Sequence, residues 1–121
     1  MKLMIHTEGW FDAAHHLDNY EGPCKNLHGH TYKVELWVRG TTKQLDKSGI
    51  LFDFGNLKQI IQKYDHAGDM TLTIGKNSTA ENQAHMFYLQ LKEMDQSLEY
   101  KVRVYEQLEP KRSYAEVGDF E

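Results

Sequence analysis

The residues best suited to chemistry lie in one short segment, GPCKNLHGHTYKVEL at residues 22–36. Its cysteine, Cys24, is the only one in the chain, and it precedes His28 and His30, which flank a single glycine. Residues two apart in a β-strand point to the same face, so the two imidazoles can converge on one metal ion. Zinc binds imidazole nitrogen at about 2.0–2.1 Å, and a His-x-His pair in a strand supplies two such ligands.

A third ligand must come from another segment. The stretch FDAAHHL offers His15 and His16, which face opposite ways in a strand, so only one of them can serve. A His-x-His pair alone is often a surface feature without a metal. Because His15 and His16 lie nearby in the sequence, a metal site is slightly favoured over a surface feature.

Three roles are open for Cys24. It can be a fourth ligand, which would close a structural Cys-His₃ zinc site. It can be a thiolate nucleophile or base beside the metal, with a pKa lowered by the cation. It can also be a buried, inert thiol. Its place after Gly-Pro, outside any apolar stripe, argues against the last role, and spacing alone does not separate the other two.

Composition limits the class of protein. The 121 residues fit one domain, 1–121, and 40% hydrophobic with 26% charged residues are ordinary for a globular protein. The net charge of −4 argues against a nucleic-acid binder. A lone cysteine forms no internal disulfide, which favours the reducing cytoplasm. No run approaches the roughly 18 apolar residues of a membrane span, and the first residues lack the apolar core of a secretory signal.

Hydrophobic periodicity predicts an α+β domain with antiparallel strand pairing. Strands are expected at 3–15, 31–40, 50–52, 100–107 and 113–117, with a turn at 46–49. A first helix is expected over 54–64, with Asp53 as its N-cap. A second helix is expected to begin at Ser78, which forms a capping-box pattern with Glu81, and to end near Met94.

One carboxylate does not fit this pattern. Alternation in YKVRVYEQ places Val102, Val104 and Glu106 on the same face of a strand. A carboxylate among core valines is unexpected in a strand that serves only for packing. Glu106 is therefore a candidate functional residue.

Together, FDAAHHL, CKNLHGHTY, YDH, STAEN and VYEQ resemble the 6-pyruvoyltetrahydropterin synthase family, and most closely its bacterial 6-carboxytetrahydropterin synthase branch of queuosine biosynthesis. The resemblance runs through essentially the whole chain. It implies the tunnelling fold (T-fold), an antiparallel β-sheet with two helices packed on one face. It also implies a homo-oligomer, a trimer or hexamer, with the site at a subunit interface.

The resemblance also assigns roles to residues. It implies that His15, His28 and His30 bind Zn²⁺, that Cys24 is catalytic and does not bind the metal, and that His16 faces away. The family's catalytic Asp-His pair matches Asp65 and His66, and its pterin-binding glutamate matches Glu106. A carboxylate can accept two parallel hydrogen bonds from the 2-amino and ring N–H groups of a pterin.

The implied reaction converts 7,8-dihydroneopterin triphosphate to 6-carboxy-5,6,7,8-tetrahydropterin, acetaldehyde and triphosphate, as a carbon–carbon and carbon–oxygen lyase. The three-residue gap between Cys24 and His28 resembles this branch. A 6-pyruvoyltetrahydropterin synthase, which eliminates triphosphate and keeps the carbon chain, is the alternative enzyme. A non-catalytic zinc-stabilised binding module is a further alternative. The segment from Asp53 to Asp65 is shorter than in the family by about one helical turn.

Overall fold

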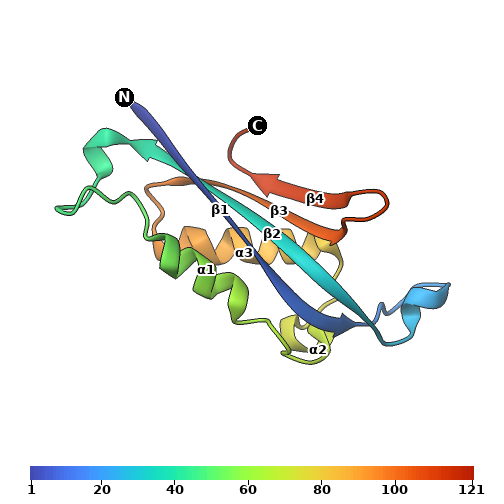
Figure 1. Cartoon of the computed structure of the whole chain (residues 1–121). Helices are drawn as coiled ribbons and strands as arrows, with labels where there is room; N and C mark the ends of the chain where they lie inside the picture. The colour runs from blue at the N-terminus through green and yellow to red at the C-terminus, as the bar shows by residue number, and fades with distance from the viewer.

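Four strands form one antiparallel sheet, in which neighbours along the chain are also neighbours in space (Figure 1). The computed structural model describes residues 1–121. The strands are β1 (Lys2–His15), β2 (His28–Thr41), β3 (Glu99–Gln107) and β4 (Ser113–Gly118). The helices are α1 (Phe54–Gln62), α2 (Met70–Ile74) and α3 (Ala80–Met94), and the short 3-10 helices are η1 (Pro23–Lys25) and η2 (Thr42–Gln44). The expected α+β architecture is confirmed.

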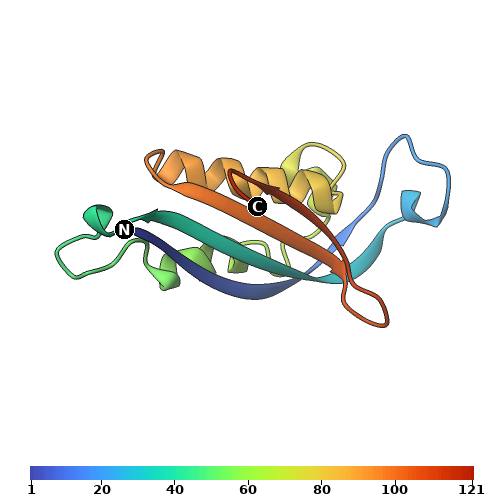
Figure 2. The same cartoon turned by 90° about the horizontal axis from the view of Figure 1, so that it is seen from above.

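The strands β1 and β2 form the longest ladder of the sheet. They pair without interruption from Lys2 opposite Thr41 to His15 opposite His28. The connection between them, blue in Figure 2, extends past the same end of the sheet as the β3–β4 turn. This end therefore gathers the end of β1, the start of β2 and the end of β3.

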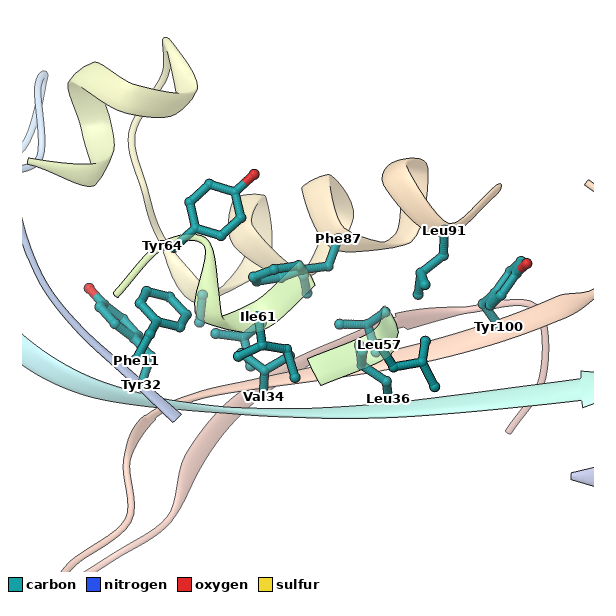
Figure 3. Close-up of a cluster of buried hydrophobic side chains, with 14 of the residues drawn as sticks. Phe11, Tyr32, Val34, Leu36, Leu57, Ile61, Tyr64, Phe87, Leu91 and Tyr100 are labelled. Carbon is teal, nitrogen blue, oxygen red and sulfur yellow. The ribbon is translucent and has the colours of Figure 1, made fainter. Parts of the chain in front are cut away.

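The hydrophobic core lies between the sheet and the helices on one of its faces (Figure 3). Alternate residues of β2 are fully buried there, as their spacing predicts. Leu57 and Ile61 of α1 and Phe87 of α3 pack onto them. Other residues of this core are Phe11, Tyr32, Val34, Leu36, Leu91, Tyr100, Val102 and Val104.

The opposite face of the sheet carries no helix and is lined by interleaved charges and aromatic rings. The ammonium of Lys101 lies 4.3 Å from the ring centre of Trp37. Lys33 forms an ion pair of 3.0 Å with Glu8. Cations held over aromatic faces and paired with carboxylates keep this surface polar although it is rich in large rings.

Most expected elements are confirmed within a few residues, but two details are wrong. The expected strand at 50–52 does not form: residue 50 is irregular and residues 51–52 are bends, because the chain leaves the sheet there to enter α1. The second long helix is capped by Thr79, whose side chain accepts a hydrogen bond from the Asn82 amide, and Ser78 is not the cap. Asp53 caps α1 as expected, through the amide of Gly55.

The short helix α2 was not expected from the sequence. Asp69 caps its start, and Gly75 ends it in the left-handed conformation. Both residues are ordinary helix boundary signals. Five residues between them were too few for a periodic apolar stripe to stand out. No helix in the chain is long and apolar enough to cross a membrane.

We expect Thr79→Ala to lower the free energy of unfolding by about 1 kcal/mol, because one amide at the start of α3 loses its acceptor. Thr79→Ser keeps a hydroxyl there and should stay close to the unmodified protein. Urea unfolding followed by circular dichroism measures both variants. Equal stability of the two variants would show that Thr79 is not the cap.

Candidate metal centre and neighbouring groups

Three histidines and one glutamate converge at the end of the sheet where β1, β2 and β3 meet. The possible ligand atoms of His15, His28, His30 and Glu106 all lie within 4.8 Å of one another. The β1–β2 register places His15 directly across from His28, and His30 follows two residues later on the same face. The three histidines named from the sequence are therefore brought together, and Glu106 joins them.

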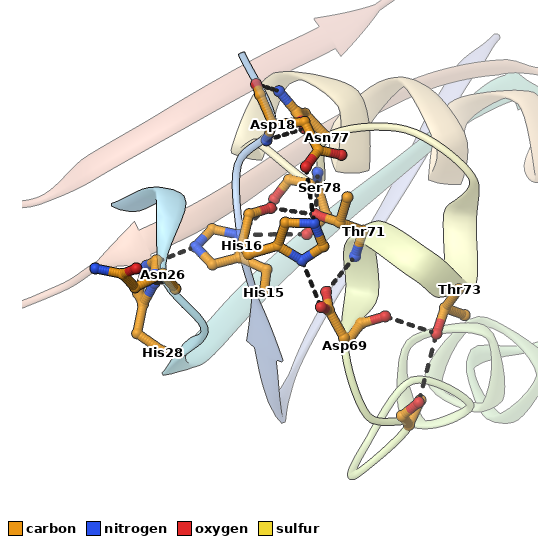
Figure 4. A network of polar contacts seen from close by, with 11 residues as sticks. His15, His16, Asp18, Asn26, His28, Asp69, Thr71, Thr73, Asn77 and Ser78 are labelled. Carbon is orange, nitrogen blue, oxygen red and sulfur yellow. Dashed lines mark hydrogen bonds and ion pairs between the residues drawn. The ribbon is translucent and has the colours of Figure 1, made fainter. Parts of the chain in front are cut away.

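Backbone carbonyl groups orient two of these imidazoles (Figure 4). The Nδ1 atom of His15 lies 2.8 Å from the carbonyl oxygen of Ser78, and Nδ1 of His28 lies 2.7 Å from that of Asn26. A carbonyl only accepts, so each Nδ1 carries the proton and each Nε2 presents a lone pair. These two Nε2 atoms are 2.9 Å apart. Two lone pairs facing each other at this distance require a cation or a proton between them.

The third imidazole and the carboxylate complete the cluster. Nε2 of His30 is buried and has no hydrogen-bond partner. It lies 3.0 Å from Oε1 of Glu106, but outside hydrogen-bonding geometry. Burial lowers the pKa of His30, and the neighbouring imidazoles act in the same direction while Glu106 opposes them. A neutral imidazole is the form that binds metals.

A buried network of hydrogen bonds holds His15 on the Nδ1 side of its ring, opposite to the Nε2 atom that faces the cluster. Gln83 donates to the Ser78 carbonyl at 3.0 Å and to the Ser78 hydroxyl at 3.1 Å. The Ser78 amide in turn donates to the hydroxyl of Thr71. Partners of this kind fix the tautomer and ring angle of a metal-binding histidine. Sequence reasoning missed Ser78 and Gln83 in this role, although a glutamine on the apolar stripe of α3 was an available signal.

The structure separates His16 from this cluster. Its Nδ1 bonds to Asp69, and its Nε2 lies 3.1 Å from Asp18. The hydrogen bond to Asp69 is the main reason that the pKa of His16 is raised. The expectation that His15 and His16 point to different surroundings agrees with this geometry.

Cys24 lies in η1, within the connection between β1 and β2. Its backbone carbonyl accepts a hydrogen bond of 2.9 Å from the Leu17 amide, which holds η1 against the end of β1. The thiol is partly exposed and does not belong to the histidine cluster. The fourth group of that cluster is a carboxylate.

Asp65 and His66 form a pair at the outer edge of β1. Nδ1 of His66 lies 3.0 Å from Oδ2 of Asp65, whose Oδ1 accepts a hydrogen bond of 2.9 Å from the Asp12 amide. That backbone bond, followed by the bond to His66, lowers the pKa of Asp65. His66 has a φ of 56°, in the left-handed region, and its amide donates to the Asp12 carbonyl at 2.8 Å. The missing helical turn before Asp65 does not break this pair.

A shallow cavity of about 530 Å³ is bordered by one residue of this pair and one residue of the histidine cluster. His30 and His66 both line it, together with Asp12 and Thr31. Within one chain, Cys24 is not a lining residue of this cavity. The structure thus brings His66 and His30 to one cavity but leaves the thiol outside it.

The donor set of the cluster fits a zinc ion. Imidazole nitrogens and carboxylate oxygens are both groups that zinc accepts, and the four groups of the cluster match its usual coordination number. The unpartnered Nε2 of His30 and the facing lone pairs of His15 and His28 provide the electrostatic reason for a cation here. The carbonyl partners supply the outer support that such ligands normally have.

The sequence matches the 6-pyruvoyl tetrahydropterin synthase family over residues 4–118. A protein from Haemophilus influenzae named 6-carboxy-5,6,7,8-tetrahydropterin synthase is 44% identical over 69 residues, 52% of this chain and 49% of its own length. One from Pyrococcus horikoshii, named putative 6-carboxy-5,6,7,8-tetrahydropterin synthase, is 42% identical over 67 residues, 54% of this chain and 41% of its own length. The matched segments thus span less than half the length of these curated relatives.

Solved structures show the same fold. The 6-pyruvoyl tetrahydropterin synthase of Plasmodium falciparum superposes with a TM-score of 0.63 over 96% of this chain and 98% of its own, at 19% identity. An uncharacterised protein from Wolinella succinogenes gives a TM-score of 0.67 over 97% of this chain and 98% of its own, also at 19% identity. These similarities confirm the expected T-fold, an α+β sheet covered by helices on one face.

Proposed function

The chain belongs to the 6-pyruvoyl tetrahydropterin synthase family, and from this premise we propose that it is a zinc-dependent 6-carboxy-5,6,7,8-tetrahydropterin synthase of queuosine and 7-deazaguanine biosynthesis. The proposed reaction converts 7,8-dihydroneopterin triphosphate and water to 6-carboxytetrahydropterin, acetaldehyde and triphosphate. The observation that carries the proposal is the convergence of three imidazole nitrogens beside a carboxylate. The names of the relatives from Haemophilus influenzae and Pyrococcus horikoshii support this choice of reaction.

His15, His28 and His30 would hold the zinc ion. When bound, the ion supplies Lewis acidity, which makes the side-chain hydroxyls of the substrate more acidic and stabilises negative charge that develops on them. The carbonyls of Ser78 and Asn26 keep two of the imidazoles in the tautomer that this binding needs. The protein therefore provides the site in a form that requires little rearrangement.

Cys24 would act as a base on the substrate side chain. Its position outside the histidine cluster leaves the thiol free of the metal, which supports a catalytic role over a Cys-His₃ structural site. The same observation weighs against a non-catalytic zinc-stabilised module. The short Cys24-to-His28 gap of this chain supports the 6-carboxytetrahydropterin branch over a 6-pyruvoyltetrahydropterin synthase.

Asp65 and His66 would move protons to and from the substrate. The ionised Asp65 carboxylate holds Nδ1 of His66, which leaves Nε2 of this exposed ring for the substrate. Glu106 would bind the pterin ring through paired hydrogen bonds.

The sheet ends in two edge strands, β1 and β4, and strand edges of this kind are templates for pairing with another chain. This supports a homo-oligomer.

We expect the purified protein to bind one zinc ion per chain. His28→Ala should abolish this stoichiometric binding, because the cluster then loses one of its three imidazoles. His16→Ala should retain the metal, since His16 bonds to Asp18 and Asp69 instead. Elemental analysis of both variants, with melting temperatures as a check of folding, measures the outcome. Loss of zinc in His16→Ala but not in His15→Ala would contradict the assignment.

We expect Cys24→Ala to keep its zinc and its melting temperature within a few degrees while losing most turnover. Removal of an acid–base group typically costs about 10²–10⁴-fold in rate. Steady-state kinetics and metal analysis on the same preparation test this. A variant that loses zinc would instead indicate that Cys24 is a metal ligand.

We expect incubation with 7,8-dihydroneopterin triphosphate to yield acetaldehyde and 6-carboxytetrahydropterin, both identified by mass spectrometry. The Cys24→Ala protein is the matched control for non-enzymatic breakdown. A product that keeps all three side-chain carbons, without acetaldehyde, would make the protein a 6-pyruvoyltetrahydropterin synthase. Absence of either product would reject the proposed function.

A further inference from the structure

The carboxylate of Glu106 has no conventional partner in the protein. It accepts no hydrogen bond, and neither a lysine nor an arginine lies within ion-pair distance of it. Its near neighbours are Nε2 of His30 at 3.0 Å and Nε2 of His15 at 3.5 Å. Nε2 of His15 presents a lone pair, so it cannot donate to a carboxylate. The carboxylate and Nε2 of His15 are therefore attracted to each other only if a cation or a proton lies between them, and Nε2 of His30 lies close to Glu106 without hydrogen-bonding geometry.

The other histidine–glutamate group of the sheet shows the contrast. His6, Glu8 and Glu35 also lie close together, but Lys33 already sits among them. Its ammonium is 3.0 Å from Glu8 and 3.5 Å from Glu35. That group already contains a cation of the protein, which contacts both carboxylates. The Glu106 group lacks such a cation.

The backbone places Glu106 where its side chain can reach two sites. The pairing of β3 with β4 shifts register between Tyr105 and Gln107, so Glu106 is the extra residue of a β-bulge. Bulges re-aim side chains, and they often occur beside active sites. Glu106 lines a polar cavity of about 320 Å³ that it shares with His30, and a second cavity of about 390 Å³ beside Glu81 and Tyr114. Its side chain is about one-third exposed, and it borders both cavities.

We propose that Glu106 is the fourth ligand of the metal while no substrate is bound, and that it leaves the metal when it binds a pterin. This inference rests on the proposed function and adds to it an exchange of the carboxylate between two partners. Without substrate, the Glu106 carboxylate then occupies the fourth position on the metal and offsets part of its charge. Pterin binding frees that position. Binding of the pterin ring and access of the side-chain hydroxyls to the metal become one coupled event.

The first test measures the metal without any turnover. We expect Glu106→Gln to weaken zinc binding by at least about tenfold, since even loss of an outer partner of a metal ligand commonly costs that much. Glu106→Asp, whose shorter side chain withdraws the carboxylate, should also weaken binding. Glu81→Gln removes a nearby carboxylate outside the cluster and should leave the affinity unchanged. Competition with a chromophoric chelator gives the dissociation constants.

The second test uses Co²⁺ in place of zinc and records its visible d–d absorption. We expect the spectra of the unmodified protein and of Glu106→Gln to differ without ligand. We expect them to converge when saturating 7,8-dihydroneopterin, which lacks the triphosphate, is added. Identical spectra and equal zinc affinities without ligand would overturn the proposal, as would failure of both proteins to bind cobalt.

The remaining outcomes separate this inference from the proposed function. Spectra that differ both with and without dihydroneopterin would keep Glu106 as a ligand but reject the exchange. Convergent spectra in a protein that releases no acetaldehyde would support the exchange and reject the proposed reaction.

Discussion

The uninterrupted register between β1 and β2 is the constraint on which the rest of the site depends. It holds His15 opposite His28 and Ala13 opposite His30, so that three imidazoles reach one point at the end of the core face. A slip of one residue would turn every side chain of a strand to the other face. The buried residues farther along the same ladder make such a slip costly. The hydrophobic core therefore specifies the position of groups that contribute nothing to it.

This arrangement buries a cluster of polar groups at the end of the hydrophobic core, and their burial carries a desolvation penalty. Ser78 and Gln83 are fully buried, and their mutual hydrogen bonds limit the penalty. The facing nitrogens of His15 and His28 have no such compensation within the chain. Under the zinc proposal, the ion supplies it, and metal binding then also stabilises the folded state. Under the same proposal, function and folding are coupled at this end of the sheet.

Much of the fold was predictable from local pattern. Alternation in β2 and β3 and the apolar stripes of α1 and α3 depend on strong, repeated burial, so they are visible in the sequence. The cap of α3 was placed one residue early, because Ser78 and Thr79 are both good caps. Thr79 is the cap because the Ser78 side chain is buried by tertiary contacts and is hydrogen-bonded to His15 and Gln83. The short helix α2 was not predicted, because it has too few residues for an apolar stripe to be visible in the sequence.

For the site, the sequence by itself determined which residue types were available and which of them share a face. The His-x-His pair, the opposed directions of His15 and His16, and the unexpected carboxylate at Glu106 all follow from strand periodicity. Only the tertiary structure decided that Glu106 rather than Cys24 joins the histidines, and that Asp65 and His66 stand at the edge of β1. The distances between these side chains depend on the strand register, on the bulge in β3 and on where the loops lie against the sheet. Those features arise from packing between distant segments, and no local pattern records them.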